Sequence, residues 1–511
     1  MAVFNESKNR NVIPNFRNLT KTAHLGELNG LGIVKNKAET GFNGLPALIQ
    51  AWQDSNHLSV ALDLLNYAYV VGEHSNVSVV QAACFVQNSY EATALQKRFA
   101  NKILNPNTSY NHSSIELSLL GFIEPEAKHR FWKFIRNMKQ LIHNYPFNPF
   151  SYVELGRLYS IIGQKSKSIN AMQIAFNLAP NNRYVIRSLV RVLVHFHEDD
   201  MARYYLNINP DFVKSDPWVL ATEIAVSTLH ESTSKNLKKG VQLLENWSKD
   251  PFHTSELASS LATEELISGS RKKSRHFFNK SLTKPNDNTL AQIEWANSKD
   301  KLLGIDVDYS QLNTFYEAKA RDSYIQKQWD SVIELTQKWF VDQPFSKTPI
   351  LMGSDVAGSI LGDYNAAYQF CEAGLLSHPN DPLLLNNSAY YLALDNKTNE
   401  ALECWGKINF NNADDVTKLC AKATRGLIHY RMQEYNEGKA YYLEAINEAY
   451  ENNQQYLYYV AFLNYAREEI IRDPSTTDHY VKQVNAIPDG LSNDIDSLKS
   501  SIRQFPSYIV L

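Results

Sequence analysis

The chain has 511 residues, 44% of them hydrophobic, and a formal net charge of −3. This length exceeds the ~250–300 residues at which a single hydrophobic core stops growing, and the hydrophobic content excludes global disorder. The small net charge provides no strong field toward nucleic acid or an anionic membrane.

The cysteines and the N-terminus narrow the setting in which we expect the protein to work. Four cysteines without a C-x-x-C pair exclude a disulfide scaffold and indicate reduced thiols packed in helices. The first ten residues lack an apolar core of signal-peptide length, and no run of about 18 apolar residues occurs. We therefore expect a cytoplasmic protein that makes no contact with a membrane.

Helical patterning is predicted to begin near Leu45. Residues 1–44 are polar and irregular, with Pro14 and several Asn and Gly, and are interpreted as an N-terminal arm. Residues 45–148 carry apolar side chains at helical spacing, interrupted by a polar loop over 105–113, and indicate a series of loosely repeating hairpins.

The segment 149–182 has the clearest internal regularity. Large residues and a Leu155-Gly156 pair lie on its first helix, Ala175 lies on its second helix, and Pro180 closes the unit. Units of similar length follow from 183, and Gly362 precedes a second helix in a later one. The small residues allow two helices to approach closely, and the glycine supplies a left-handed turn.

This pattern resembles the tetratricopeptide repeat family, whose unit of about 34 residues is a helix-turn-helix hairpin that cannot bury its apolar face alone. The resemblance is strongest over 149–182 and 313–452. It implies an all-α, right-handed α-solenoid with a concave groove lined by the first helices. The predicted divisions are 1–44 for the arm, 45–148 for degenerate hairpins, 149–312 for the central repeats, 313–452 for the C-terminal repeats and 453–511 for a capping helix and tail.

The resemblance also implies which positions face the groove. In this chain those positions hold Phe150, Arg157, Tyr184, Arg187 and Arg191 in the central units, and Asn386, Asn387, Tyr390 and Tyr430 in later ones. The three guanidinium groups would form a basic patch suited to a carboxylate or an acidic peptide. Alternatively, each arginine pairs with an Asp or Glu of a neighbouring helix. Chaperone-binding members of the family grip a carboxylate with Lys, Arg and Asn, but no basic residue accompanies the two asparagines in that pattern.

Other reactive residues are interpreted as structural. The run His195–Asp200 falls in a turn and lacks a third ligand at helical spacing, so no metal site is predicted. The basic run Arg271–His276 is interpreted as a solvated face. Cys420 and His429 lie nine residues apart on one helix and do not predict a catalytic pair. No phosphate-binding, nucleophile-elbow or zinc-protease motif occurs, so we expect neither an enzyme nor a cofactor.

The sequence therefore predicts a non-catalytic protein–protein interaction scaffold or adaptor. A peptide or helix of a partner protein, an acidic one if the arginines face it, would lie in the groove. The alternative is an RNA-binding helical-repeat protein. That function needs a continuous basic groove, which the net charge disfavours, so nucleic acid is not the expected partner.

Overall fold

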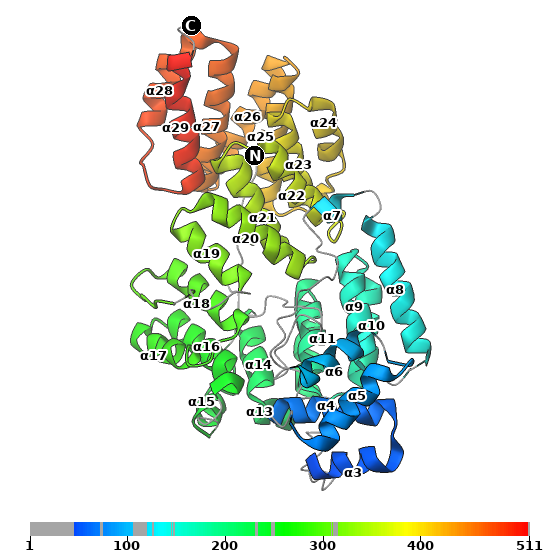
Figure 1. Cartoon of the computed structure of the whole chain (residues 1–511). Helices are drawn as coiled ribbons and strands as arrows, with labels where there is room; N and C mark the ends of the chain where they lie inside the picture. Colours follow the sequence, from blue (N-terminus) through cyan, green and yellow to red (C-terminus); the bar gives the residue numbers. More distant parts are fainter. Residues whose placement is uncertain are drawn as a thin grey trace.

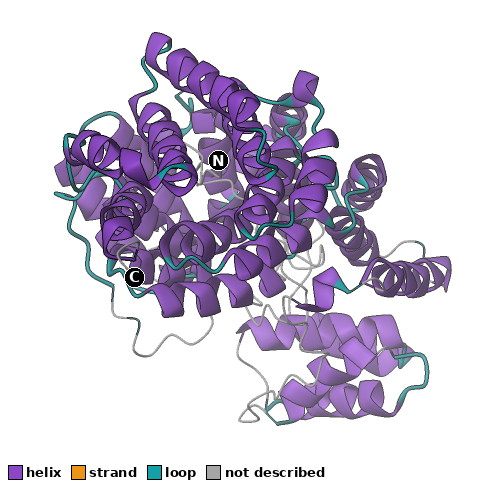
Figure 2. Ribbon diagram, turned by 90° about the horizontal axis from the view of Figure 1, so that it is seen from above, coloured by secondary structure: helices purple, strands orange, loops and turns teal. Residues whose placement is uncertain are grey.

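A computed structural model describes residues 45–508 except for 72–74, 93, 106–119, 125–126, 145, 147–148, 230–232, 247–250, 308 and 310–314. Within these residues every regular element is a helix (Figures 1 and 2). The predicted arm, residues 1–44, and most of the loop predicted over 105–113 lie outside the described residues. No helix in the described part is both long enough and apolar enough to cross a bilayer.

The four N-terminal helices of the described chain form hairpins with a core of their own. They are α3 (Leu45–Ser55), α4 (Leu58–Val71), α5 (Val77–Asn88) and α6 (Ala94–Leu104). Trp52 packs edge-on against Phe85 with 5.0 Å between the ring centroids. Leu64, Ala82 and Val86 are fully buried in this cluster, which shares no residue with the other described cores.

The next helices include the best-matching repeat. They are α7 (Leu120–Ile123), α8 (Ala127–Asn144), α9 (Pro149–Ile161), α10 (Lys165–Leu178), α11 (Arg183–His195) and α12 (Asp199–Ile208). A Cβ at Gly156 would lie 2.8 Å from Met172 Cε and 3.2 Å from the Ser168 carbonyl oxygen. The small residue predicted from the repeat therefore lets α9 and α10 approach closely.

The middle of the chain departs furthest from a regular repeat. Its helices are α13 (Pro210–Ser215), α14 (Pro217–Leu229), α15 (Leu237–Asn246), α16 (Pro251–Ile267), α17 (Arg271–Ser281), α18 (Asp287–Lys299), α19 (Tyr316–Ile325) and α20 (Trp329–Asp342). An irregular stretch follows α18, and Gly304 adopts a φ of 55° there. The short helix α13 was not predicted.

The C-terminal helices return to regular hairpins. They are α21 (Lys347–Asp355), η1 (Val356–Ile360), α22 (Tyr364–Leu375), α23 (Pro382–Leu394), α24 (Thr398–Gly406), η2 (Phe410–Asn412), α25 (Asp415–Arg431), α26 (Tyr435–Glu451), α27 (Gln455–Arg472), η3 (Pro474–Thr476), α28 (Thr477–Asn485) and α29 (Asn493–Tyr508). The π-helical turn η1 was not predicted. Gly362 has a φ of 75° before α22, as the turn predicts.

The fold class is confirmed as an all-α helical-repeat solenoid, but the chain also closes upon itself. One hydrophobic core contains residues from α7 to α16 together with Phe340, Phe345 and Phe370. The Phe122 and Phe340 rings lie 4.9 Å apart, and the α9–α10 turn meets the α22–α23 loop, since a Cβ at Gly163 would lie 2.8 Å from the Ser377 carbonyl oxygen. We call this contact between residues 122–197 and 340–381 the seam. It brings together units that the repeat pattern places far apart.

Candidate functional site

Three arginines line one face of α11. Arg183, Arg187 and Arg191 follow one another at intervals of four residues, which places their side chains on the same side of the helix. The helix begins at Asn182, whose side chain accepts hydrogen bonds from the amides of Tyr184 and Val185. The sequence prediction named only the second and third of these arginines.

Arg183 connects α11 to the start of α14. Its Nε and Nη2 both lie 3.0 Å from Oδ2 of Asp216. The other oxygen of this carboxylate caps α14 by accepting hydrogen bonds from the amides of Trp218, at 3.0 Å, and Val219, at 3.1 Å. One carboxylate thus satisfies both a guanidinium and a helix N-terminus, where the helix dipole also favours negative charge.

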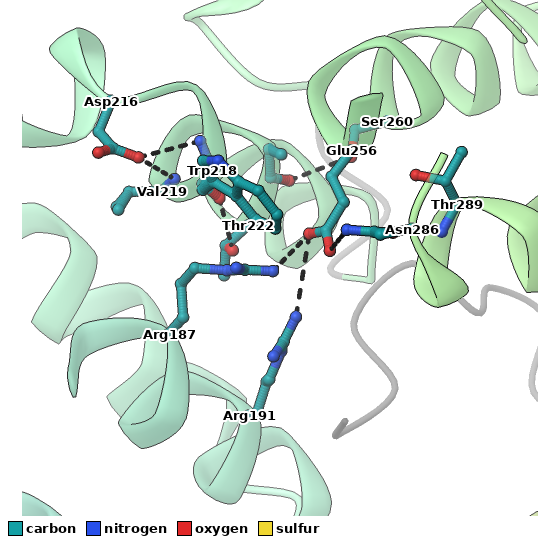
Figure 3. Close-up of polar contacts among 11 residues, drawn as sticks. Arg187, Arg191, Asp216, Trp218, Val219, Thr222, Glu256, Ser260, Asn286 and Thr289 are labelled. Atoms are coloured by element: carbon teal, nitrogen blue, oxygen red, sulfur yellow. Dashed lines mark hydrogen bonds and ion pairs between the residues drawn. The ribbon is translucent and has the colours of Figure 1, made fainter. Parts of the chain in front are cut away.

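The other two arginines converge on Glu256 of α16 (Figure 3). Arg187 donates a short hydrogen bond to Glu256 Oε2, and Arg191 Nη2 lies 3.9 Å from the same oxygen. The second oxygen of Glu256 accepts a 2.7 Å hydrogen bond from Asn286, which caps α18. Arg187 also lies over the ring of Trp218, 4.7 Å from its centroid, an arrangement that stabilises a cation by the ring's quadrupole. These contacts link α11, α14, α16 and α18.

Arg157 lies in a separate contact on α9. Its Nε is 2.9 Å from Glu154 Oε2, and its Nη2 is 2.5 Å from Oε1, so the pair is bidentate. Burial disfavours the charged form of Arg157, but the carboxylates of Glu154 and Asp342 and the Tyr184 hydroxyl more than compensate and raise its pKa. Since Asp342 ends α20, this arginine also faces the seam.

The structure therefore confirms ion pairing with a neighbouring helix for Arg187 and Arg191, which was the alternative to an open basic patch. The three predicted arginines are only 2–8% exposed. Their use by a partner stays a prediction. Phe150 and Tyr184 are half-buried, with ring centroids 5.9 Å apart, so these two predicted groove residues do lie together.

The predicted asparagines of α23 are buried among polar side chains. Asn386 Nδ2 lies 3.2 Å from Asn387 Oδ1, and Thr424 of α25 donates a 2.8 Å hydrogen bond to Asn386 Oδ1. Both amides are at most 1% exposed. Their use by a partner also stays a prediction.

The predicted groove residues Tyr390 and Tyr430 both bond to α27, and their use by a partner stays a prediction. Tyr390 donates a 2.7 Å hydrogen bond to Asn464 of α27, and Tyr430 donates a short one to Glu469 of the same helix. Each residue is only 4% exposed, and burial raises the pKa of Tyr390 to about 12. The two hydroxyls thus connect first helices of the C-terminal repeats, α23 to α27 and α25 to α27.

The run His195–Asp200 is only partly the solvated turn that was predicted. His197 is exposed, but the His195 ring lies at the seam. Its centroid is 5.5 Å from that of the Phe345 ring and 5.3 Å from that of the His378 ring. His378 is held by a 2.8 Å hydrogen bond between its Nε2 and the Phe345 carbonyl oxygen. Burial and the neighbouring His378 lower the pKa of His195 well below its usual value.

The basic run and the four cysteines lie on helices of the described part of the chain. The basic run lies in the first turns of α17, where Arg271 pairs with Asp300 at 2.6 Å. None of the four cysteines forms a disulfide, but Cys84 is exposed rather than packed as expected. Within the described ranges, no three His, Cys, Asp or Glu side chains are arranged to hold a metal ion.

Four important residues of the site were missed: Arg183, Trp218, Glu256 and Asn286. A helical spacing of four from Arg187 could have identified Arg183, and the Asp216-Pro217 pair indicates a helix start. No local signal indicates Glu256, because it meets Arg187 across 69 residues of sequence.

Comparisons with known proteins give a likeness of fold only. No family model and no curated protein matches the chain. Two solved structures resemble it at low sequence identity. A human IFIT1 dimer with m7Gppp-AAAA is 10% identical over 79% of this chain and 94% of that chain, with a TM-score of 0.34. A structure of Naa15/Naa10 bound to HypK-THB is 12% identical over 95% of this chain and 88% of that chain, with a TM-score of 0.24.

Proposed function

We propose that this chain is a non-catalytic scaffold that binds a segment of a partner protein along its first helices. The observation that carries the proposal is the connected row of polar and aromatic side chains on α11, α14 and α16, with a second polar group on α23 and α25. We call these positions together the inner face: Arg187, Arg191, Trp218, Glu256, Asn386, Asn387 and Thr424. They lie on α11, α14, α16, α23 and α25, each the first helix of its hairpin. In solenoids of stacked repeats, such helices provide extended binding surfaces.

The chemistry of these positions favours recognition over stability alone. Burying a guanidinium and a carboxylate is costly, and well-packed apolar residues of similar volume often stabilise a fold as well or better. Glu256 nevertheless joins Arg187, Arg191 and Asn286 in the centre of the repeats. A partner carboxylate or amide could exchange with one of these groups, which supports an extended segment with acidic or amide side chains as the ligand.

The test compares a variant of the inner face with one of the outer surface. Arg191→Gln removes a charge that lies 3.9 Å from Glu256, while Arg203→Gln changes an exposed arginine on the second helix α12. Partners would be recovered by affinity capture and quantified by mass spectrometry, and the strongest would then be titrated directly against each purified variant.

We expect Arg191→Gln to weaken direct binding about tenfold or more, because a lost charged hydrogen bond costs roughly 1.5–3 kcal/mol, and Arg203→Gln to leave it unchanged. Equal binding by wild type and both variants would contradict the assignment of the surface. Retention of RNA with an affinity that falls steeply with salt would instead establish the alternative function.

A further inference from the structure

Two first helices of this solenoid, α11 and α23, are buried on every side, including the side that carries the inner face. All residues from Leu384 to Leu394 of α23 are buried, as are those from Val185 to Leu193 of α11. In a stacked hairpin, the second helix and the two adjacent repeats cover three sides of a first helix. A helix that is buried all round must have its remaining side covered as well.

The side chains on that remaining side are polar. Asn386, Asn387 and Arg187 are no more than 2% exposed. Buried amides and guanidinium groups require hydrogen-bond partners. These three side chains make contacts in addition to those with Thr424, Glu256 and Trp218. The inner face is thus suited to an occupant that is rich in backbone and amide hydrogen-bonding groups.

The chain itself provides a segment of suitable length. Forty-four residues precede Leu45. Fully extended, they reach at most ~150 Å, whereas neighbouring helices pack only about 8–10 Å apart. The segment is therefore long enough to pass several first helices.

The composition of residues 1–44 also suits the inner face. Six Lys or Arg and three Glu give this segment a charge of +3, so that residues 45–511 carry −6 of the total of −3. Acidic side chains of the first helices, including Asp287 and Glu317, are 3–4% exposed. Eight asparagines and apolar residues such as Phe4, Ile13 and Phe16 supply amide partners and anchors.

We propose that residues 1–44 lie along the inner face of the same chain as an intramolecular occupant. A partner segment would then have to displace them, so the arm acts as a built-in competitor. The displacement rests on the proposed scaffold function, whereas the occupancy does not. An acidic partner segment would compete for Arg187 and Arg191, while the basic residues of the arm would be released from the acids.

Photo-crosslinking of the full-length chain tests the occupancy. Benzoylphenylalanine would replace Phe16 and, as a matched control, the 98% exposed Tyr90. A mixture of light and heavy isotope-labelled protein would distinguish links within one chain from links between two. We expect the probe at position 16 to form links within one chain to α11, α14, α16, α23 or α25, and the probe at position 90 to form none there. Links to second helices such as α10 and α12, links between chains, or a yield no higher than the control would each overturn the proposal.

Hydrogen exchange gives a second measurement that does not depend on the probe. A protease site placed between Gly44 and Leu45 of the full chain would release the arm. A tethered segment acts at an effective concentration on the order of 1 mM. With a Kd of about 0.1 mM, its loss should speed amide exchange in α11 and α23 about tenfold, and leave α10 and α12 unchanged. Unchanged exchange in α11 and α23 would overturn the proposal.

The two proposals fail in distinguishable ways. If the cross-links form but no partner is recovered, the arm occupies the inner face and the scaffold function is wrong. If a partner binds the full chain and the cleaved chain with equal affinity, the partner uses another surface, and the competition between arm and partner is excluded.

Discussion

The central and the C-terminal repeats join their first helices with different chemistry. In the central repeats, buried charges make the contacts: Arg183 with Asp216, and Arg187 and Arg191 with Glu256. In the C-terminal repeats, neutral hydroxyls and amides join α23 to α25 and α27, as in the hydrogen bond from Tyr390 to Asn464, and a charged pair between Arg431 and Glu468 joins α25 to α27. The inner positions of α11 and α23 are both buried, so these two helices differ in the charge they carry there and not in their exposure.

This difference has a consequence for stability. A buried charge that loses its partner is left in a medium of low dielectric constant, whereas a neutral hydroxyl that loses one leaves a smaller desolvation cost. The central repeats should therefore be more sensitive to the loss of a single group, to pH and to competing ions than the C-terminal repeats. The following predictions test that comparison.

The largest effect is expected from removing Glu256. Glu256→Ala leaves two guanidinium groups and Asn286 without their shared carboxylate, and should lower the free energy of unfolding of the central repeats by about 3–5 kcal/mol. Urea denaturation, with hydrogen exchange to locate the loss, measures it. The control Glu265→Ala breaks a 3.8 Å pair with the mostly exposed Lys273 and should cost at most ~1 kcal/mol. Equal costs for the two variants would contradict the comparison.

A smaller effect is expected at the corresponding C-terminal contact. Tyr390→Phe removes one hydroxyl and leaves the side-chain oxygen of Asn464 buried without it, which should cost about 1–3 kcal/mol. Tyr204→Phe, at a 63% exposed position of α12, should change stability by less than ~0.5 kcal/mol. A loss at Tyr390 as large as that at Glu256 would show that charge is not the deciding difference.

The two regions should also respond to pH in opposite directions. At the seam, burial lowers the pKa of His195 and of His378, with Lys347 near both rings, and Asp381 acts in the opposite sense on His378. Because the unfolded chain then binds more protons, the stability of the seam is present above the ordinary histidine pKa of about 6.5 and is lost as the pH falls below it. Each histidine contributes at most about 1.4 kcal/mol per pH unit.

At the α21–α29 contact, burial and the neighbouring Asp494 raise the pKa of Asp355 to about 8. This carboxyl is protonated in the folded state, so its contribution is fully present below the ordinary aspartate pKa and is lost as the pH rises through about 8. Hydrogen exchange between pH 5.5 and 8.5, corrected for the intrinsic rate, should show α11 protected more at high pH and α29, which lies outside the seam, protected more at low pH. His195→Gln should flatten the first trend, and His129→Gln, on the exposed side of α8, should not. Parallel trends in both helices would contradict the assignment.

The smallest effect is expected from a surface network in the C-terminal repeats. Lys422 lies 2.7 Å from Glu444 and 2.5 Å from Glu448, with about a third of its side chain exposed. Lys422→Ala should cost less than ~1 kcal/mol, and 1 M salt should remove most of that cost. The loss caused by Glu256→Ala should persist in the same salt, since buried pairs are screened much less. Salt sensitivity of the Glu256 variant would show that solvent reaches the inner face.

The elements that the sequence predicted well depend on local patterns. The helices of 149–182 and the turn at Gly362 follow from spacing within one unit, because Gly156 and Gly362 act on residues only a few positions away. The π-helical turn η1 was missed because a single glycine, Gly358, inside a helical pattern does not by itself predict a π-helical turn. The turn is accommodated by tertiary packing. The Tyr391 ring occupies the space that a Cβ at Gly358 would need, so only glycine leaves room for the ring.

By itself, the sequence determined the helical-repeat class, the hairpins and the inward positions of Arg157, Arg187 and Arg191, because a repeat of about 34 residues fixes which side of a helix faces its neighbours. Only the tertiary structure decided what these side chains meet. Arg187 reaches Glu256 across 69 residues of sequence, and His195 reaches Phe345 and His378 at the seam. Such contacts depend on the small rotation between successive repeats, which accumulates along the solenoid and leaves no periodic signal in the sequence.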